Sequence, residues 1–208
     1  MRKLHDRYFR QAKRENKLAR SIYKLEELDR ADKLLRPGDR VLDLGAAPGS
    51  WLEHILARVG PGGVVCAVDL KVIDRKFKGR VHFRRADARE LAPDAFSDVA
   101  PAFDVVLSDM APNTTGIRIT DQARSLELCE SAWGYARRAL RPGGHFVCKI
   151  FDSPDADAFR QGLSGFFRDV RSRKPDACRG ESFERYFVGL HFQPSGLPGE
   201  SAINRSVV

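Results

Sequence analysis

The sequence has 208 residues, of which 42% are hydrophobic and 31% are charged. This balance is typical of an ordinary soluble globular protein, and the length suits one domain of the larger sort. The chain contains no apolar run of about eighteen residues, and its first residues, MRKLHDRYFR, include no apolar signal segment. We therefore expect no membrane span, no secretory signal and a cytoplasmic location.

The net charge of +8 is concentrated near the N-terminus. Residues 1–24 carry nine basic and two acidic side chains, interleaved with Tyr8, Phe9 and Tyr23. Such a stretch is either a solvated helix face or an arm that binds phosphates. We predict a basic, RNA-facing arm and helix at 1–35, which packs on a core domain at 36–192, and a flexible tail at 193–208.

From residue 36 onward, short apolar runs alternate with amphipathic stretches, the pattern of βα units on a parallel sheet. The predicted strands lie at 39–45, 63–70, 80–87, 103–110, 144–151, 167–173 and 185–192, and the predicted helices at 50–60, 120–140 and 155–163. This order predicts a single doubly wound, Rossmann-like α/β domain with a mostly parallel seven-stranded sheet. Ligands of such sheets bind at the carboxyl ends of the strands.

The four cysteines are widely separated, form no C-x-x-C pair and have no histidine at ligand spacing; they are Cys66, Cys129, Cys148 and Cys178. This pattern favours small apolar residues over a disulfide framework or a zinc site. We expect no metal.

The stretch DLGAAPGSW, Asp43 to Trp51, directly follows the first predicted strand. Gly45 and Gly49 allow a sharp turn and a close backbone approach to a ligand at the start of the next helix. The spacing is G-x-x-x-G and not the G-x-G-x-x-G of dinucleotide-binding folds. It therefore argues against a nicotinamide-dependent reductase.

Aspartates stand at the ends of the first three strands: Asp43, Asp69 and Asp87. Each could be only a helix cap. Together they would repel a phosphate but suit a cationic adenosyl ligand such as S-adenosylmethionine. Asp69 is then placed to accept the ribose hydroxyls, Asp87 the adenine amine, and Asp43 lies near the amino acid end.

Lys149 interrupts the apolar strand GHFVCKIF, and Asp109 ends the preceding strand. A lysine rarely lies in a core without a reason. It is either an edge lysine that reaches solvent or a functional group beside Asp109.

Four stretches of the sequence resemble the FtsJ/RrmJ (RlmE-type) family of ribosomal RNA large-subunit 2′-O-methyltransferases. They are ARSIYKLEELDRADKLLRPGDRVLDLGAAPGSW, VLSDMAPNTTG, LRPGGHFVCKIF and RKPDACRGESFERYFV. The resemblance runs in unbroken order from about His5 to Phe192. Ser50 departs from the family, whose bacterial members usually have glycine there.

The resemblance implies a catalytic tetrad of Lys24, Asp109, Lys149 and Glu184. With the motif above, it also implies an S-adenosyl-L-methionine site formed by Asp43, Gly45, Pro48, Gly49, Ser50, Trp51, Asp69, Asp87 and Asp109. The family's best-known bacterial member methylates a uridine ribose of large-subunit rRNA in ribosomal particles.

We therefore expect a monomeric enzyme that methylates large-subunit rRNA and binds it through the N-terminal arm. The alternatives are a 2′-O-methyltransferase of tRNA or another RNA, and a non-catalytic RNA-binding or ribosome-assembly module. Lys149 is the candidate general base, which requires a pKa below the ordinary value of about 10.4. In the alternative mechanism Lys149 stays charged and stabilises the developing alkoxide.

Overall fold

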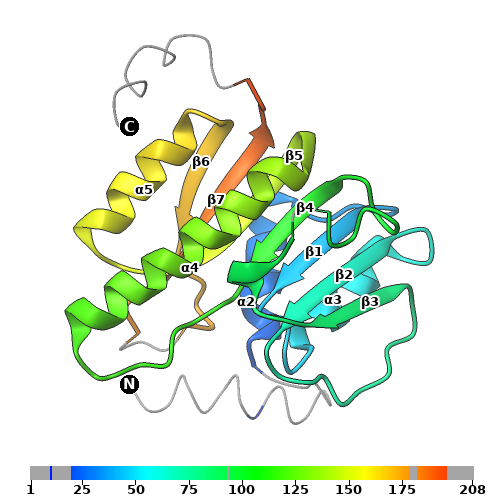
Figure 1. Ribbon diagram of the computed structural model, residues 1–208, viewed down its shortest axis with the longest axis horizontal. Helices are drawn as coiled ribbons and strands as arrows, with labels where there is room; N and C mark the ends of the chain where they lie inside the picture. The colour runs from blue at the N-terminus through cyan, green and yellow to red at the C-terminus, as the bar shows by residue number, and fades with distance from the viewer. Residues whose placement is uncertain (1–9, 11–19, 93, 179–181, 196–208) are drawn as a thin grey trace.

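The structure is a computed structural model that describes residues 10, 20–92, 94–178 and 182–195 (Figure 1). Most of the predicted basic arm, residues 1–9 and 11–19, and the tail from residue 196 lie outside the described residues. None of the described helices is long and apolar enough to cross a membrane.

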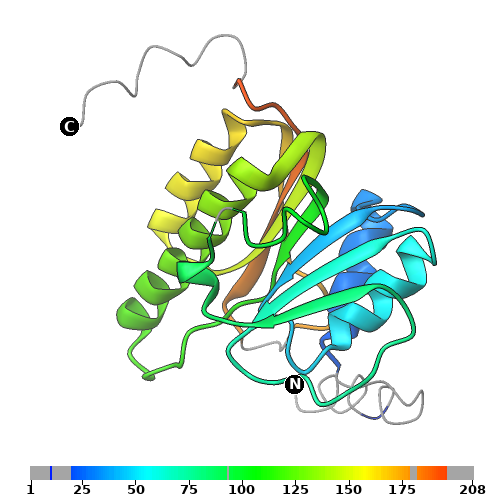
Figure 2. The same ribbon diagram turned by 45° about the vertical axis from the view of Figure 1, so that its right-hand side comes forward.

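Seven strands form one sheet in the order β3-β2-β1-β4-β5-β7-β6 (Figures 1 and 2). The strands are β1 (Arg40–Leu44), β2 (Val64–Asp69), β3 (Val81–Arg85), β4 (Phe103–Ser108), β5 (Leu140–Phe151), β6 (Phe167–Arg173) and β7 (Glu184–Phe192). The first five are parallel, whereas β7 pairs antiparallel with both β5 and β6. The predicted single α/β domain with a mostly parallel seven-stranded sheet is confirmed.

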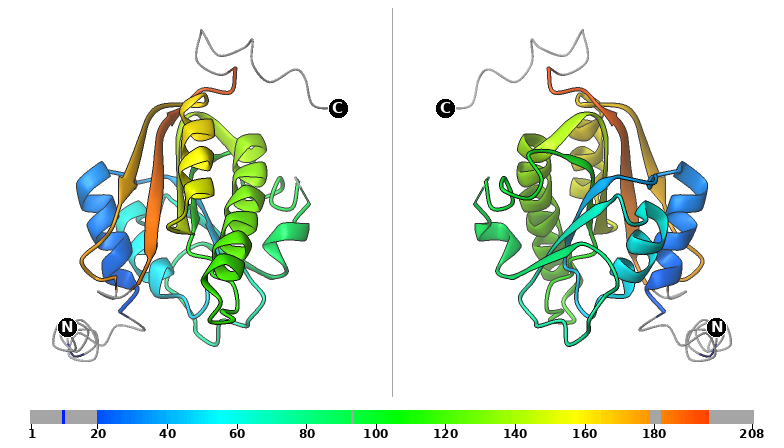
Figure 3. Two further views of the ribbon diagram at one scale, coloured as in Figure 1. Left: turned by 90° about the vertical axis from the view of Figure 1, so that its left-hand side faces the viewer. Right: turned by 90° about the vertical axis from the view of Figure 1, so that its right-hand side faces the viewer.

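Helices cover both faces of the sheet (Figure 3). They are α2 (Ile22–Asp32), α3 (Ser50–Val59), the short 3-10 helix η1 (Ala88–Glu90), α4 (Arg118–Ala139) and α5 (Pro154–Ser164). Residues of α2 and α3 share one buried apolar cluster with the inner strands, and residues of α4 and α5 share the other. Strand residues alternate between the two clusters, so the central strands are apolar on both faces.

The predicted element boundaries agree with the structure to within a few residues. α4 begins at Arg118 and not at residue 120, because the carboxylate of Asp121 accepts hydrogen bonds from the backbone N–H groups of Thr115 and Gly116. These bonds fix the loop that precedes the helix. β5 starts at Leu140 and not at residue 144, so the Pro-Gly segment before the predicted strand is part of it.

Candidate active site

The glycine loop follows β1 at the carboxyl edge of the sheet. Gly45 and Gly49 have φ angles of 82° and 98°, a region that favours glycine. A Cβ on Gly45 would lie 2.9 Å from Cγ of Met110, and one on Gly49 would lie 2.6 Å from Cζ of Phe77. Both glycines are therefore required by backbone conformation and by close packing.

A cavity of about 520 Å³ opens next to this loop, at the carboxyl ends of β1, β2, β3 and β4. Its size suits a small organic ligand. Four of the predicted cofactor residues line it: Gly45, Asp69, Asp87 and Asp109. The position agrees with the rule that open α/β sheets bind ligands beyond the carboxyl ends of their strands.

Asp69 and Asp87 already hold protein groups. The carboxylate of Asp69 accepts hydrogen bonds from the backbone N–H of Ala47, at 2.8 Å, and of Lys71, at 2.7 Å. Asp87 caps η1 by accepting from the backbone N–H of Arg89, whose guanidinium also pairs with it at 2.5 Å. These hydrogen bonds from Arg89 hold the pKa of Asp87 below its ordinary value. Both carboxylates thus fix loops at the mouth of the cavity.

Asp43 is fully buried in β1, and neither of its carboxylate oxygens has a hydrogen-bond partner within the described structure. Burial raises the pKa of this carboxyl well above its ordinary value, and the nearby charges of Asp109 and Asp69 raise it further. Buried carboxylates are almost always paired. An unpaired one beside a ligand cavity marks a candidate binding group.

Five of the predicted cofactor residues are not among those that line the cavity; they are Asp43, Pro48, Gly49, Ser50 and Trp51. Two of them connect α3 to the segment before α2. The hydroxyl groups of Ser50 and Ser21 are 2.6 Å apart, and the indole N–H of Trp51 donates to the backbone oxygen of Ser21 at 2.9 Å. The observed contacts therefore position α2, which carries Lys24.

Lys149 points from β5 toward the end of β4. Its Nζ lies 3.0 Å from Oδ1 of Asp109 and also donates a hydrogen bond to the Asp109 backbone oxygen. The hydroxyl of Tyr186 donates to the same Oδ1 at 2.7 Å. Lys149 and Tyr186 are buried, whereas Asp109 also borders the cavity. The carboxylate of Asp109 thus links the lysine to the ligand space.

Lys24 and Glu184 form the second ion pair of the site. Nζ of Lys24 lies 2.5 Å from Oε1 of Glu184, and their side chains are only 8% and 14% exposed. The same ammonium group lies 5.9 Å from the ring centre of Tyr186. Tyr186 therefore contacts both ion pairs, and all four residues of the predicted tetrad come together although they belong to four separate elements.

The charges of the site support one another. Burial alone would raise the pKa of Asp109, but the charges of Lys149 and Lys24 hold it below its ordinary value. Burial alone would lower the pKa of Lys24, but Asp109 and Glu184 outweigh it and raise that pKa. Glu184 is likewise held low by Lys24 against the effect of burial. The four side chains are arranged as two ion pairs.

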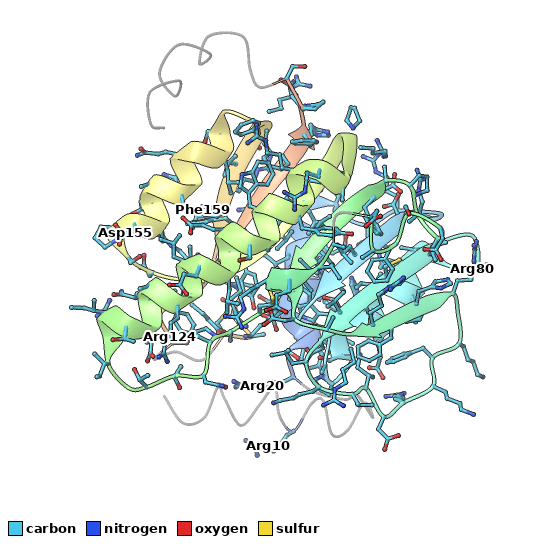
Figure 4. The ribbon with its side chains drawn as sticks, in the orientation of Figure 1. Arg10, Arg20, Arg80, Arg124, Asp155 and Phe159 are labelled. Carbon is cyan, nitrogen blue, oxygen red and sulfur yellow. The ribbon has the colours of Figure 1, made fainter. Side chains whose placement is uncertain are left out.

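Three residues of this site escaped the sequence analysis. Tyr186 reads as a core aromatic, yet it lies two positions after Glu184 and therefore on the same face of β7. That alternation was the signal that could have identified it. Arg89, which holds Asp87, and Arg124 of α4, which lines the cavity and is labelled in Figure 4, have no comparable sequence signal.

The comparison with protein families gives a direct match. The FtsJ-like methyltransferase family matches residues 18–192, a range that includes every residue of the tetrad and of the predicted cofactor site. The chain therefore belongs to the FtsJ-like methyltransferase family, and it is an enzyme of the methyltransferase class. The resemblance seen in the sequence is confirmed.

Individual relatives of this chain have more specific names than the family. The chain is 50% identical to ribosomal RNA large subunit methyltransferase E of Bdellovibrio bacteriovorus over 89% of this chain and 95% of that protein. It is 48% identical to the protein of the same name from Syntrophobacter fumaroxidans, over 92% and 98%. Among solved structures, one described as a ribosomal RNA methyltransferase from Plasmodium falciparum has a TM-score of 0.74 and 26% identity, over 84% of this chain and 97% of that one.

Proposed function

We propose that this enzyme transfers a methyl group from S-adenosyl-L-methionine to the 2′-oxygen of a uridine ribose in large-subunit (23S-type) rRNA, with ribosomal particles as its substrate. The observation that carries the proposal is the convergence of Lys149–Asp109 and Lys24–Glu184 beside the cavity. The names of the relatives supply the substrate class. We further propose a cytoplasmic monomer.

The cavity fits the proposed cofactor. S-adenosylmethionine carries a positively charged sulfonium, which supplies an activated methyl group when the cofactor is bound. Three aspartates line the cavity, Asp69, Asp87 and Asp109, and the unpaired carboxylate of Asp43 lies close to Asp69 and Asp109. A cationic ligand would offset the cost of these buried negative charges, whereas a phosphate would increase it. Asp43, Asp69 and Asp87 are the residues that we assign to holding it.

Lys149 is the residue that we assign to the proton of the ribose hydroxyl. A hydroxyl is a poor nucleophile until its proton leaves, and a positioned amine can accept that proton. Asp109 holds the Lys149 amine at 3.0 Å, and the Tyr186 hydroxyl fixes the Asp109 carboxylate in turn. The Lys24–Glu184 pair places a second ammonium group near Asp109 and positions the centre. The apolar surroundings of β5 keep water away from the amine.

The proposal is tested by incubating the protein with labelled S-adenosylmethionine and one of three RNA substrates: large ribosomal subunits, naked large-subunit rRNA or tRNA. The modified nucleotide is then mapped. We expect one 2′-O-methylated uridine in the rRNA of the subunits and little label in the other two substrates. Label in tRNA alone would replace the proposed substrate, and label on a base nitrogen or carbon would overturn the proposed chemistry.

A further inference from the structure

The β2–β3 connection, residues 70–80, carries a second concentration of positive charge that lies within the described structure. Its sequence, LKVIDRKFKGR, contains five basic residues and one acidic residue. All five basic side chains are exposed. Arg75 pairs with Glu53 of α3 at 2.5 Å. Within the described part of the chain, the other four make no ion pair: Lys71, Lys76, Lys78 and Arg80.

Two of the four apolar side chains of this connection fix it against the body of the enzyme, while the other two are exposed. Ile73 and Phe77 pack against the apolar cluster that contains α2 and α3. Phe77 is also the ring that a Cβ on Gly49 would strike, so the connection lies directly against the glycine loop. The Arg75 guanidinium lies over the Phe77 ring, 5.8 Å from its centre. Because Ile73 and Phe77 hold the connection in place, its basic side chains form a fixed outer surface.

This basic surface adjoins the cavity. The connection begins directly after Asp69, and its first two residues, Leu70 and Lys71, line the cavity wall. It then passes the glycine loop at Phe77 and ends at Arg80, at the amino end of β3, which Figure 4 shows on the side opposite Asp155 and Phe159 of α5. A long substrate that reaches into the cavity from this side would therefore pass over the part of the connection nearest the glycine loop.

We propose that the β2–β3 connection is a second surface for the RNA phosphate backbone, separate from the N-terminal arm; this inference rests on the proposed function. Four carboxylates line the cavity and repel a polyanion at the point where the target nucleotide must enter, and three basic side chains of the wall offset only part of that charge. Fixed cations beside it offset that repulsion by pairing with the phosphates of neighbouring nucleotides. These contacts position RNA without reading its sequence.

The test compares two double variants that lose the same charge. The first combines Lys76→Gln and Lys78→Gln. The control combines Arg138→Gln and Arg168→Gln, which are exposed at the end of α4 and the start of β6, at the amino ends of the strands and therefore away from the cavity. Binding of large ribosomal subunits and of naked large-subunit rRNA is measured over a series of salt concentrations, together with kcat, KM and cofactor affinity.

For the loop variant we expect the slope of log affinity against log salt to become shallower by about 1 to 2. We also expect a KM for RNA about tenfold higher at physiological salt, with kcat and cofactor affinity unchanged. The control should keep the wild-type slope. A double variant, Lys76→Arg with Lys78→Arg, should also keep it, which would show that charge and not packing is responsible.

A loop variant with the wild-type slope would overturn the inference and leave the proposed function intact. Equal losses in the loop variant and in the control would also overturn it, because net charge and not position would then set the affinity. A wild-type protein that binds RNA but methylates none would instead overturn the proposed function, and the comparison of slopes would still decide the role of the loop.

Discussion

Asp43 and Asp32 are both buried aspartates, but their surroundings are opposite. Asp32, at the end of α2, accepts hydrogen bonds from Arg171 at 2.6 Å and from Arg173 at 2.7 Å and 3.0 Å. Burial alone would raise the pKa of Asp32, but the two arginines outweigh it and lower that pKa. Asp43 has no such partner in the described structure, and its pKa is raised.

The presence or absence of guanidinium partners distinguishes a buried aspartate that stabilises the fold from one that we propose for ligand binding. A buried carboxylate with guanidinium donors contributes to stability, since the donors replace the water that it loses. A buried carboxylate without donors costs stability and persists only where another selective advantage offsets that cost. Asp32 therefore joins α2 to β6, whereas our proposal assigns Asp43 to a cationic ligand.

The largest effect is expected on methyl transfer when Lys149, the proposed proton acceptor, is replaced. Lys149→Arg keeps the positive charge beside Asp109 but cannot accept a proton near neutral pH. We expect methyl transfer in single-turnover assays to fall by about 10² to 10⁴-fold. Cofactor affinity should stay within about twofold of the wild type, because the proposal places Lys149 in no direct contact with the cofactor.

Residual turnover within about tenfold of the wild type would contradict the role of Lys149 as a base. Lys149 would then act as a fixed positive charge that stabilises the alkoxide. Cofactor affinity measured on the same preparation is the control, because a variant that binds the cofactor normally has kept the shape of the cavity.

The second effect concerns stability alone. Asp32→Asn removes the negative charge that holds Arg171 and Arg173, and we expect the free energy of unfolding to fall by about 2 kcal/mol. The loss is smaller than for a fully buried pair, because the two arginines are 39% and 37% exposed and solvent screens them. Urea unfolding measures it, and cofactor affinity should not change.

Asp169→Asn is the matched control for this variant. Asp169 also pairs with Arg171, at 2.6 Å, but its side chain is 41% exposed. Its substitution should cost less than about 1 kcal/mol, as expected for a surface ion pair. Equal losses for the two variants would mean that burial does not distinguish Asp32 from an ordinary surface carboxylate.

The third variant, Asp43→Asn, is expected to weaken cofactor binding and raise stability, a pattern opposite to that of Asp32→Asn. Asp43→Asn keeps the shape of the side chain and removes its charge. We expect cofactor affinity, measured by titration calorimetry, to fall about tenfold. The free energy of unfolding should rise by about 1 kcal/mol, because a neutral amide costs less to bury than a carboxylate. A destabilised variant with normal cofactor affinity would show that Asp43 is a structural residue.

The sequence alone does not show which buried aspartate has a partner. The partners of Asp32 lie 139 and 141 residues further along the chain, and only the folded structure brings them together. Lys149 was predictable because a lysine conflicts with the apolar pattern of its strand. Its link to Asp109 was inferred from two neighbouring strand ends, and the ion pair confirms that contact.

The limits of sequence reasoning are clearest where one residue type suits two environments. Trp51 is expected at the cofactor through the family resemblance, which stays a prediction, and in the structure its indole N–H donates to the backbone oxygen of Ser21. The direction in which the ring turns depends on how α2 packs against α3. From the sequence alone, the β2–β3 connection looks like an ordinary link between two strands. Its basic surface is evident only when Ile73 and Phe77 are seen to face inward.

The smallest expected effect is a change in how stability depends on pH. Asp32 and Asp43 contribute to this dependence with opposite signs. The lowered pKa of Asp32 means that the folded state binds fewer protons below the ordinary value of 3.8, so its stabilisation is lost as pH falls through the folded pKa. The raised pKa of Asp43 means that the folded state keeps a proton above 3.8 that the unfolded state has lost. Rising pH therefore lowers stability through Asp43.

Urea unfolding across the acid and neutral range tests this reversal. Relative to the wild type, Asp32→Asn should make the slope of unfolding free energy against pH less positive below 3.8, and Asp43→Asn should make it more positive above 3.8. Each change amounts to at most about one proton, or 1.4 kcal/mol per pH unit. Slopes that shift in the same direction would mean that Asp43 has a partner in solution, and the contrast between the two carboxylates would fail.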